Sequence, residues 1–255
     1  MSTDRQNGSL YTQIVNKVAT IEFGHPASNS FPSELLDRLT KEFYKLSDND
    51  YVNVIILKSE GERAFCAGAS FNELIAINNL EEGTRFFSGF ANVINAMRIC
   101  KKIIIGRVQG KAVGGGVGLV AACDYVLATE KASIKLSELS IGIGPFVIAP
   151  AVQRKIGIAG LSELTLAATE WKNAYWAKEK GLFAKVFETI NELDQEVGFL
   201  AQKTASYHAN ALITMKKTLW IGTENWETLL KERAKISGKL VLSDFTKNSL
   251  QKFKK

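Results

Sequence analysis

Residues 114–118, within the stretch GKAVGGGVG, carry four glycines in five positions of an otherwise apolar segment. Each glycine in a regular element costs about 0.5–1 kcal/mol of folding free energy relative to alanine. The cluster follows the apolar run IIIGRV and precedes the apolar run VGLVAAC, which predicts a turn between a strand and a helix. Such a turn exposes backbone N–H groups at the positive end of a helix, where they can bind an anionic oxygen.

The cluster fits neither common phosphate-binding motif. A dinucleotide fingerprint would require a glycine at position 121, after Gly116 and Gly118, but Ala121 stands there. A P-loop would require serine or threonine after Lys111, and the next residue is Ala112. The glycines therefore predict a site where backbone N–H groups bind an oxygen of another kind of ligand.

A second stretch, ERAFCAGASFNEL at residues 62–74, has the same organisation. It follows the predicted strand NVIILKS and places the small residues CAGAS before a possible helix. Two such corners can direct their N–H groups at one oxygen. The pair predicts an oxyanion hole, which stabilises a thioester carbonyl that takes on negative charge.

The rest of the chain alternates strand and helix signals. An antiparallel hairpin is predicted around Asn16 and Lys17, a helix over residues 31–46, and strands near 53–59, 102–110, 124–129 and 132–137. From Pro145 onward the pattern is helical, with one short strand near 184–188. These signals predict an α/β fold with a largely parallel sheet covered by helices.

Composition narrows the classes of function. With 255 residues, 46% of them hydrophobic, the chain can bury a sizeable core, and its apolar runs are shorter than the roughly 20 residues of a membrane span. The N-terminus lacks the apolar block of a secretory signal, so a cytoplasmic location without membrane attachment is expected. Cys66, Cys100 and Cys123 are expected to be free, buried thiols. The net charge of +6 fits an acidic partner, but no nucleic-acid signature accompanies it.

The two loops together make the chain recognisable. RAFCAGAS followed by VQGKAVGGGVGLVAACDYVLATEKASIKLSELSIGIGP resembles the crotonase family, also called the enoyl-CoA hydratase/isomerase superfamily. The resemblance runs from about Leu10 into the C-terminal helices. It implies a spiral of β-β-α units over residues 1–190. It also implies a helical region over residues 191–255 that mediates assembly into homotrimers or hexamers and contacts coenzyme A.

The resemblance also implies roles for individual residues. The N–H groups of Ala69 and Gly115 match the two oxyanion donors. The first loop, with Ala67 and Gly68, matches the site of the coenzyme A adenine, and Arg63 is placed for its phosphates. Lys252, Phe253 and Lys254 are candidates for further contacts with coenzyme A. The substrate is then an acyl-CoA thioester, with no permanently bound cofactor and no metal.

The proton carrier distinguishes the reactions of this family. Its hydratases use two glutamates, and the alignment of the motifs puts Gly118 at the first position and Glu138 at the second. Hydration requires one group to deprotonate water and another to protonate the α-carbon. A single base can move a double bond, so isomerisation of a 3-enoyl-CoA to a 2-enoyl-CoA is favoured. Gly118, Ile143, Pro145 and Phe146 are expected to line the acyl pocket.

Other functions stay open from the sequence. An enoyl-CoA hydratase of fatty-acid or branched-chain acyl-CoA metabolism could hold its water through Ser137, Ser140 or Glu73. A decarboxylase would use the same thioester enolate. A family member without catalysis could bind coenzyme A or RNA. Phe146 and its apolar neighbours in GIGPFVIAP fit either an apolar acyl pocket or ordinary helix packing.

Overall fold

The computed structural model describes residues 7–252 and contains a six-stranded sheet and a four-stranded sheet. The large sheet has the order β1-β2-β3-β5-β7-β10. Its β1 and β2 pair antiparallel through a turn in which Asn16 and Lys17 have positive φ angles of 49° and 66°, and all other pairs are parallel. The strands are β1 (Ser9–Val15), β2 (Val18–Gly24), β3 (Val54–Ser59), β5 (Ile103–Val108), β7 (Tyr125–Thr129) and β10 (Lys185–Phe187).

The small sheet is built from strands of two or three residues in the order β4-β6-β8-β9. They are β4 (Ala64–Cys66), β6 (Lys111–Val113), β8 (Ser133–Lys135) and β9 (Lys172–Asn173). Each of β3, β5 and β7 is followed by one strand of the small sheet and then by helical structure. This repetition confirms the predicted spiral of β-β-α units.

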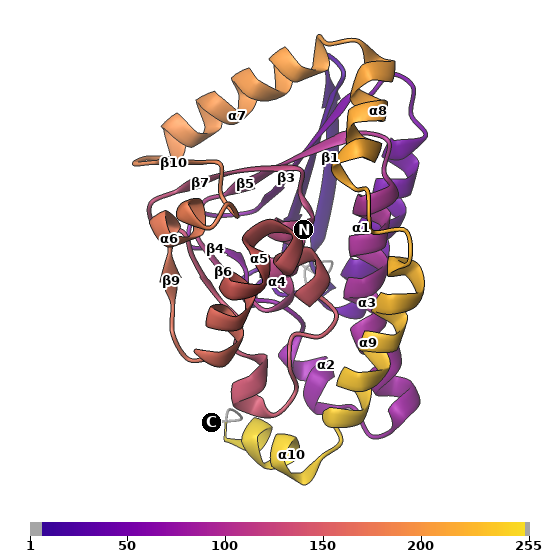
Figure 1. The fold of residues 1–255 in the computed structure, drawn as a ribbon, viewed down its shortest axis with the longest axis vertical. Helices are drawn as coiled ribbons and strands as arrows, with labels where there is room; N and C mark the ends of the chain where they lie inside the picture. Colours follow the sequence, from indigo (N-terminus) through magenta and orange to yellow (C-terminus); the bar gives the residue numbers. More distant parts are fainter. Residues whose placement is uncertain (1–6, 253–255) are drawn as a thin grey trace.

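The helices pack on both faces of the large sheet, as Figure 1 shows. They are α1 (Ser33–Ser47), α2 (Phe71–Ile75), α3 (Leu80–Ile99), α4 (Gly115–Ala122), α5 (Ala149–Leu166), α6 (Ala174–Glu179), α7 (Ile190–Ala205), α8 (Ala209–Leu219), α9 (Trp226–Leu240) and α10 (Asp244–Gln251). A 3-10 helix, η2 (Glu138–Ile141), lies between β8 and α5. The helical C-terminal region expected from the resemblance is present, and its boundary at residue 190 stays a prediction.

The alternation of side chains along β3 explains why both faces are covered. Ile55 and Leu57 belong to the main core cluster, which includes apolar residues of α1 and α3. Val54 and Ile56 belong to a second cluster that includes Leu193 and other apolar residues of α7. Because successive strand residues point to opposite faces, a continuous apolar run such as VIIL must be buried on both sides.

The three cysteines lie buried and free, as predicted. Burial raises the pKa of the Cys66 and Cys123 thiols to about 12, so neither forms a nucleophilic thiolate at neutral pH. Among residues 7–252, no helix is long and apolar enough to cross a membrane.

Helices α3 and α9 lie side by side over the site described below (Figure 1). Their backbones approach closely where Gly83 meets Gly238. A Cβ atom at Gly83 would lie 2.8 Å from the carbonyl oxygen of Gly238, and a Cβ at Gly238 would lie 2.6 Å from the nitrogen of Thr84. This contact fixes the distance between the two helices.

We expect Gly83→Ala to lower the free energy of unfolding by about 1–3 kcal/mol, because the added methyl group meets backbone that cannot move away. Gly198→Ala in α7 is the matched control, since a Cβ there has no neighbour within 4 Å. The control should be neutral or stabilising by up to about 1 kcal/mol. Urea denaturation measures both changes, and equal stability of the two variants would contradict this packing.

Candidate active site

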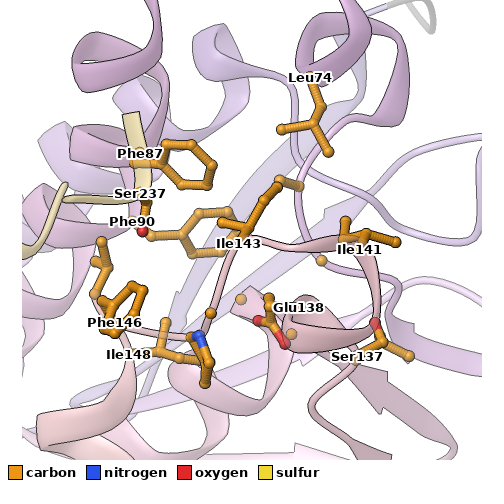
Figure 2. Close-up of a pocket in the computed structure, with 18 of the residues that line it drawn as sticks. Leu74, Phe87, Phe90, Ser137, Glu138, Ile141, Ile143, Phe146, Ile148 and Ser237 are labelled. Atoms are coloured by element: carbon orange, nitrogen blue, oxygen red, sulfur yellow. The ribbon is translucent and has the colours of Figure 1, made fainter. Parts of the chain in front are cut away.

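A cavity of about 180 Å³ lies where the first turns of α2 and α4 meet η2, α3 and α9. Figure 2 shows its side chains. Most of them are apolar, among them Leu74, Phe86, Phe87, Phe90, Ile143 and Ile148. Glu138 is the only ionisable side chain among the described residues that line it.

The first predicted loop forms one wall of the cavity through Ala67, Gly68 and Ala69. Ala69 forms an isolated parallel bridge with Phe31, which uses the carbonyl of Gly68 and the N–H of Ser70. Because hydrogen-bonding groups alternate along an extended chain, the N–H of Ala69 takes no part in that bridge.

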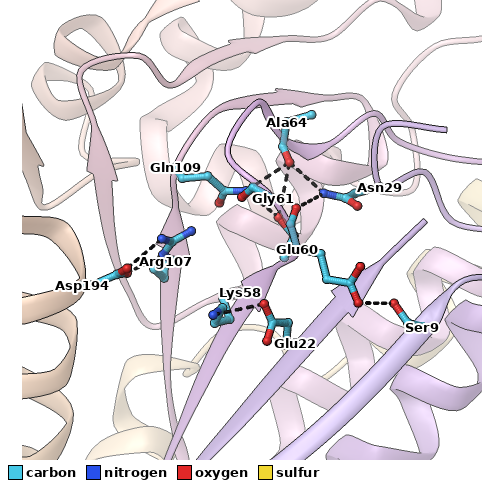
Figure 3. Close-up of polar contacts among 11 residues, drawn as sticks. Ser9, Glu22, Asn29, Lys58, Glu60, Gly61, Ala64, Arg107, Gln109 and Asp194 are labelled. Carbon is cyan, nitrogen blue, oxygen red and sulfur yellow. Dashed lines mark hydrogen bonds and ion pairs between the residues drawn. The ribbon is translucent and has the colours of Figure 1, made fainter. Parts of the chain in front are cut away.

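Buried polar side chains hold the segment that leads into this loop (Figure 3). The carbonyl of Ala64 accepts hydrogen bonds from Asn29 at 2.9 Å and from Gln109 at 3.2 Å. Gln109 also donates to the carbonyl of Gly61 and Asn29 to that of Glu60, at 3.0 and 2.8 Å. Gln109 and Asn29 therefore fix the start of the strand from which the first loop emerges.

The second loop also lines the cavity, through Val113, Gly114 and Gly115. Gly114 has φ = 53°, a conformation that favours glycine, and Gly115 is the first residue of α4. The N–H of Gly115 has no acceptor in its helix, as for any first helical residue. A Cβ at Gly115 would lie 2.3 Å from the Phe90 ring, and one at Gly68 would lie 3.6 Å from the Gly115 nitrogen. The two loops thus meet, as the sequence predicted.

Glu138, the first residue of η2, lies among the side chains of the cavity (Figure 2). A Cβ at Gly114 would lie 2.9 Å from Glu138 Oε1. Although the residue as a whole is partly exposed, its Oε2 is buried and has no hydrogen-bond partner in the described part of the chain. This burial raises the pKa of Glu138 from 4.5 to about 7. A carboxyl group with that pKa can accept and return a proton near neutral pH.

Gly118 was expected to line the acyl pocket, but it is buried and is not among the residues that line the cavity. Ile148 packs directly over it. A Cβ at Gly118 would lie 2.4 Å from Ile148 Cγ2 and 2.8 Å from its Cβ. At the position that the resemblance aligns with the first glutamate of family hydratases, the contact between Gly118 and Ile148 leaves no room for a side chain.

The structure places the other predicted residues as follows. Ile143, Pro145 and Phe146 line the cavity. Arg63 is exposed near the start of β4, and Lys252 is the exposed C-cap of α10; neither lines the cavity. Phe253 and Lys254 lie outside the described residues.

Two of the three candidate water-holding groups are engaged elsewhere. Glu73 caps α1, where its carboxylate accepts hydrogen bonds from the N–H and the hydroxyl of Ser33. Ser140 donates to the carbonyl of Ser137 at 2.7 Å. Ser137 itself lines the cavity.

Sequence reasoning missed two contributors to the site. Helix α3 supplies Phe86, Phe87 and Phe90, and α9 supplies Ser237. The spacing of the phenylalanines, FFSGF, is a signal for one helical face and could have revealed the first contribution. No local pattern points to Ser237, because its place depends on how α9 packs against α3.

The first loop with Ala69, the second loop with Gly115 and the carboxyl of Glu138 thus lie around one cavity. The sequence matches the family described as enoyl-CoA hydratase/isomerase over residues 13–255. The chain belongs to that family, the crotonase superfamily expected from its two loops.

The curated relatives include both isomerases and hydratases. The chain is 28% identical over 211 residues to a peroxisomal Δ(3,5)-Δ(2,4)-dienoyl-CoA isomerase of Arabidopsis thaliana, covering 77% of this chain and 72% of that protein. It is 30% identical over 237 residues to a mitochondrial enoyl-CoA hydratase of Pongo abelii, covering 91% and 78%.

Solved structures share the fold. The enoyl-CoA hydratase of Bacillus halodurans superposes with a TM-score of 0.88 at 20% identity, covering 95% of this chain and 99% of that one. The enoyl-CoA hydratase of Bacillus anthracis superposes with a TM-score of 0.78 at 27% identity, covering 90% and 89%.

The raised pKa of Glu138 has a consequence for stability. The folded protein holds this proton up to about pH 7, whereas the unfolded chain releases it near its ordinary pKa of 4.5. The wild-type protein should therefore lose about 3 kcal/mol of stability from this group between about pH 4 and pH 8.

Glu138→Gln should remove that loss, so the variant should be more stable than wild type at about pH 8 and similar to it at about pH 4.5. Denaturation midpoints at the two pH values measure the effect. Glu130→Gln, which changes an exposed carboxylate in the β7–β8 turn, is the control and should leave the wild-type pH dependence in place. An unchanged pH dependence in Glu138→Gln would mean that this carboxyl is hydrated.

Proposed function

We propose that the protein is an isomerase that converts a 3-enoyl-CoA thioester into the 2-enoyl-CoA isomer with Glu138 as its single acid–base group. The observation that carries this proposal is the contact of Ile148 with Gly118, which leaves no space at this position for the side chain of a second carboxylate. One base is sufficient to move a double bond. Two functional groups are needed to add water across it.

The reaction uses three groups of the chain. The Glu138 carboxylate removes a proton from the α-carbon, and the electron pair of that C–H bond passes to the thioester oxygen. The N–H groups of Ala69 and Gly115 hold the resulting oxyanion; one such donor contributes about 2.7–4 kcal/mol to a barrier of this kind. The thioester carbonyl then re-forms, and the enolate electrons become the α,β double bond. The electron pair of the former β,γ double bond takes the proton back from Glu138 at the γ-carbon.

Hydration is the second candidate, because Ser137 lines the cavity close to Glu138 and curated relatives include hydratases. A serine hydroxyl can hold a water molecule but is a weak base. A hydratase with this site would therefore add water with Glu138 as the only carboxylate of the described cavity lining. No observation favours a decarboxylase or a family member that only binds coenzyme A or RNA.

The coenzyme A moiety would lie outside the cavity, along the first loop. Ala67 is exposed and adjoins the cavity, and the exposed Arg63 lies four residues earlier, in reach of the same surface. Several large apolar side chains of the helical half are exposed, among them Ile158, Leu166, Tyr175, Phe199 and Ile221. Their exposure supports assembly into the trimer or hexamer implied by the resemblance.

Glu138→Gln should lower kcat for isomerisation of a 3-enoyl-CoA at least 1000-fold and leave binding of a saturated acyl-CoA unchanged, because only the proton carrier is lost. Glu73→Gln is the matched control and should keep kcat within about threefold. The wild-type rate should fall below about pH 7 as Glu138 becomes protonated. The increase in absorbance of the conjugated 2-enoyl-CoA product measures the rate. Full activity of Glu138→Gln would contradict the assignment.

The Gly118 position can be tested directly. Gly118→Glu alone should destabilise the protein, because its Cβ collides with Ile148. The double variant Gly118→Glu, Ile148→Gly removes both colliding atoms and should recover much of the stability. It should also raise the ratio of crotonyl-CoA hydration to isomerisation at least 10-fold over Ile148→Gly alone. An equal ratio in these two variants would show that the second carboxylate is not what the wild type lacks for hydration.

A further inference from the structure

Of the polar side chains that line the cavity, Ser237 of α9 lies farthest from Glu138, the proposed proton carrier. Figure 2 shows that it enters on the side of Phe87 and Phe90, whereas Glu138 enters from the opposite side. Ser237 is 1% exposed and lines the cavity. Its hydroxyl has no hydrogen-bond partner within residues 7–252, although serines in helices commonly bond to a carbonyl of the preceding turn, as Ser88 does to Thr84.

Helix packing alone does not account for a serine at this position. The close contact between α9 and α3 is made by the next residue, Gly238, against Gly83 and Thr84. A buried hydroxyl without a partner is unfavourable in an apolar wall, where alanine would fill nearly the same space. A ligand atom that bonds to the hydroxyl would remove that penalty.

The surroundings of Ser237 limit the chemistry of such a ligand atom. The described lining of the cavity contains no lysine, arginine or histidine, so a carboxylate on the acyl chain would be buried without a counter-ion. The carboxyl of Glu138 would also repel it. A hydroxyl or carbonyl oxygen, in contrast, carries no charge and can pair with a serine that both donates and accepts.

We propose that Ser237 selects acyl-CoA thioesters that carry an uncharged oxygen, as a hydroxyl or keto group, on the acyl chain beyond the γ-carbon. The chain extends from the oxyanion loops between Phe90 and Phe146, and its oxygen bonds to the Ser237 hydroxyl. This inference rests on the proposed binding of acyl-CoA in the cavity. It adds a specificity determinant on α9 that is separate from the proton-transfer groups.

Binding of unreactive substrates tests the proposal without depending on turnover. The probes are saturated, unbranched acyl-CoA thioesters of one chain length: one unsubstituted, one with a terminal carboxylate, and a series with a hydroxyl group moved along the carbons beyond the γ-carbon. Calorimetry measures each Kd for the wild type, Ser237→Ala and the control Ser88→Ala, which removes a serine of α3 that does not line the cavity.

We expect one position in the series to bind the wild type and Ser88→Ala about 10-fold tighter than the unsubstituted chain, a preference that Ser237→Ala abolishes. The carboxylate probe should bind more weakly than the unsubstituted chain. If every probe binds but none shows a preference that depends on Ser237, the specificity proposal is wrong while acyl-CoA binding stands. If no acyl-CoA binds, both the specificity proposal and the proposed function are wrong.

Discussion

The site depends on the close approach of two loops that only residues without side chains permit. Gly68 lies against the backbone of Gly115, and the ring of Phe90 covers the place where a Gly115 side chain would be. The N–H groups of Ala69 and Gly115 can then face one cavity. Gln109 and Asn29 hold the start of β4, from which the first loop emerges, and Phe90 lies on α3, which packs against α9. The proposed substrate binding and chemistry both depend on that arrangement.

The same compact arrangement removes water from Glu138. Its Oε2 has no partner in the described chain, and the carboxyl lies against Gly114, where a side chain would displace it. Folding with a desolvated carboxyl costs stability at high pH, and the same desolvation gives a base with a pKa of about 7. Ile148 packs over Gly118 and leaves no room for a side chain there, and our proposal of a single acid–base group rests on this contact.

Sequence alone was sufficient for the parts of the site that are built from short continuous segments. Both loops and the hairpin turn at Asn16 and Lys17 follow from motifs of a few residues, whereas Glu138 was identified through the resemblance to the crotonase family. The contact of Gly118 with Ile148 joins segments 30 residues apart, so the loss of a cavity position at Gly118 could not be read from either segment. Of the strands of the small sheet, only β8 lies in a segment where a strand was predicted; β4, β6 and β9 are too short to show an alternating pattern. Ser237 enters only through the packing of α9.

The central claim is that one shielded carboxyl group carries the proton from the α-carbon to the γ-carbon. A 3-enoyl-CoA deuterated at the α-carbon, converted in ordinary water, tests it by mass analysis of the product. Because Glu138 is buried, part of the deuterium should appear at the γ-carbon of the 2-enoyl-CoA before it exchanges with solvent. A product whose γ-carbon contains hydrogen from water alone, from the first turnover onward, would contradict the account.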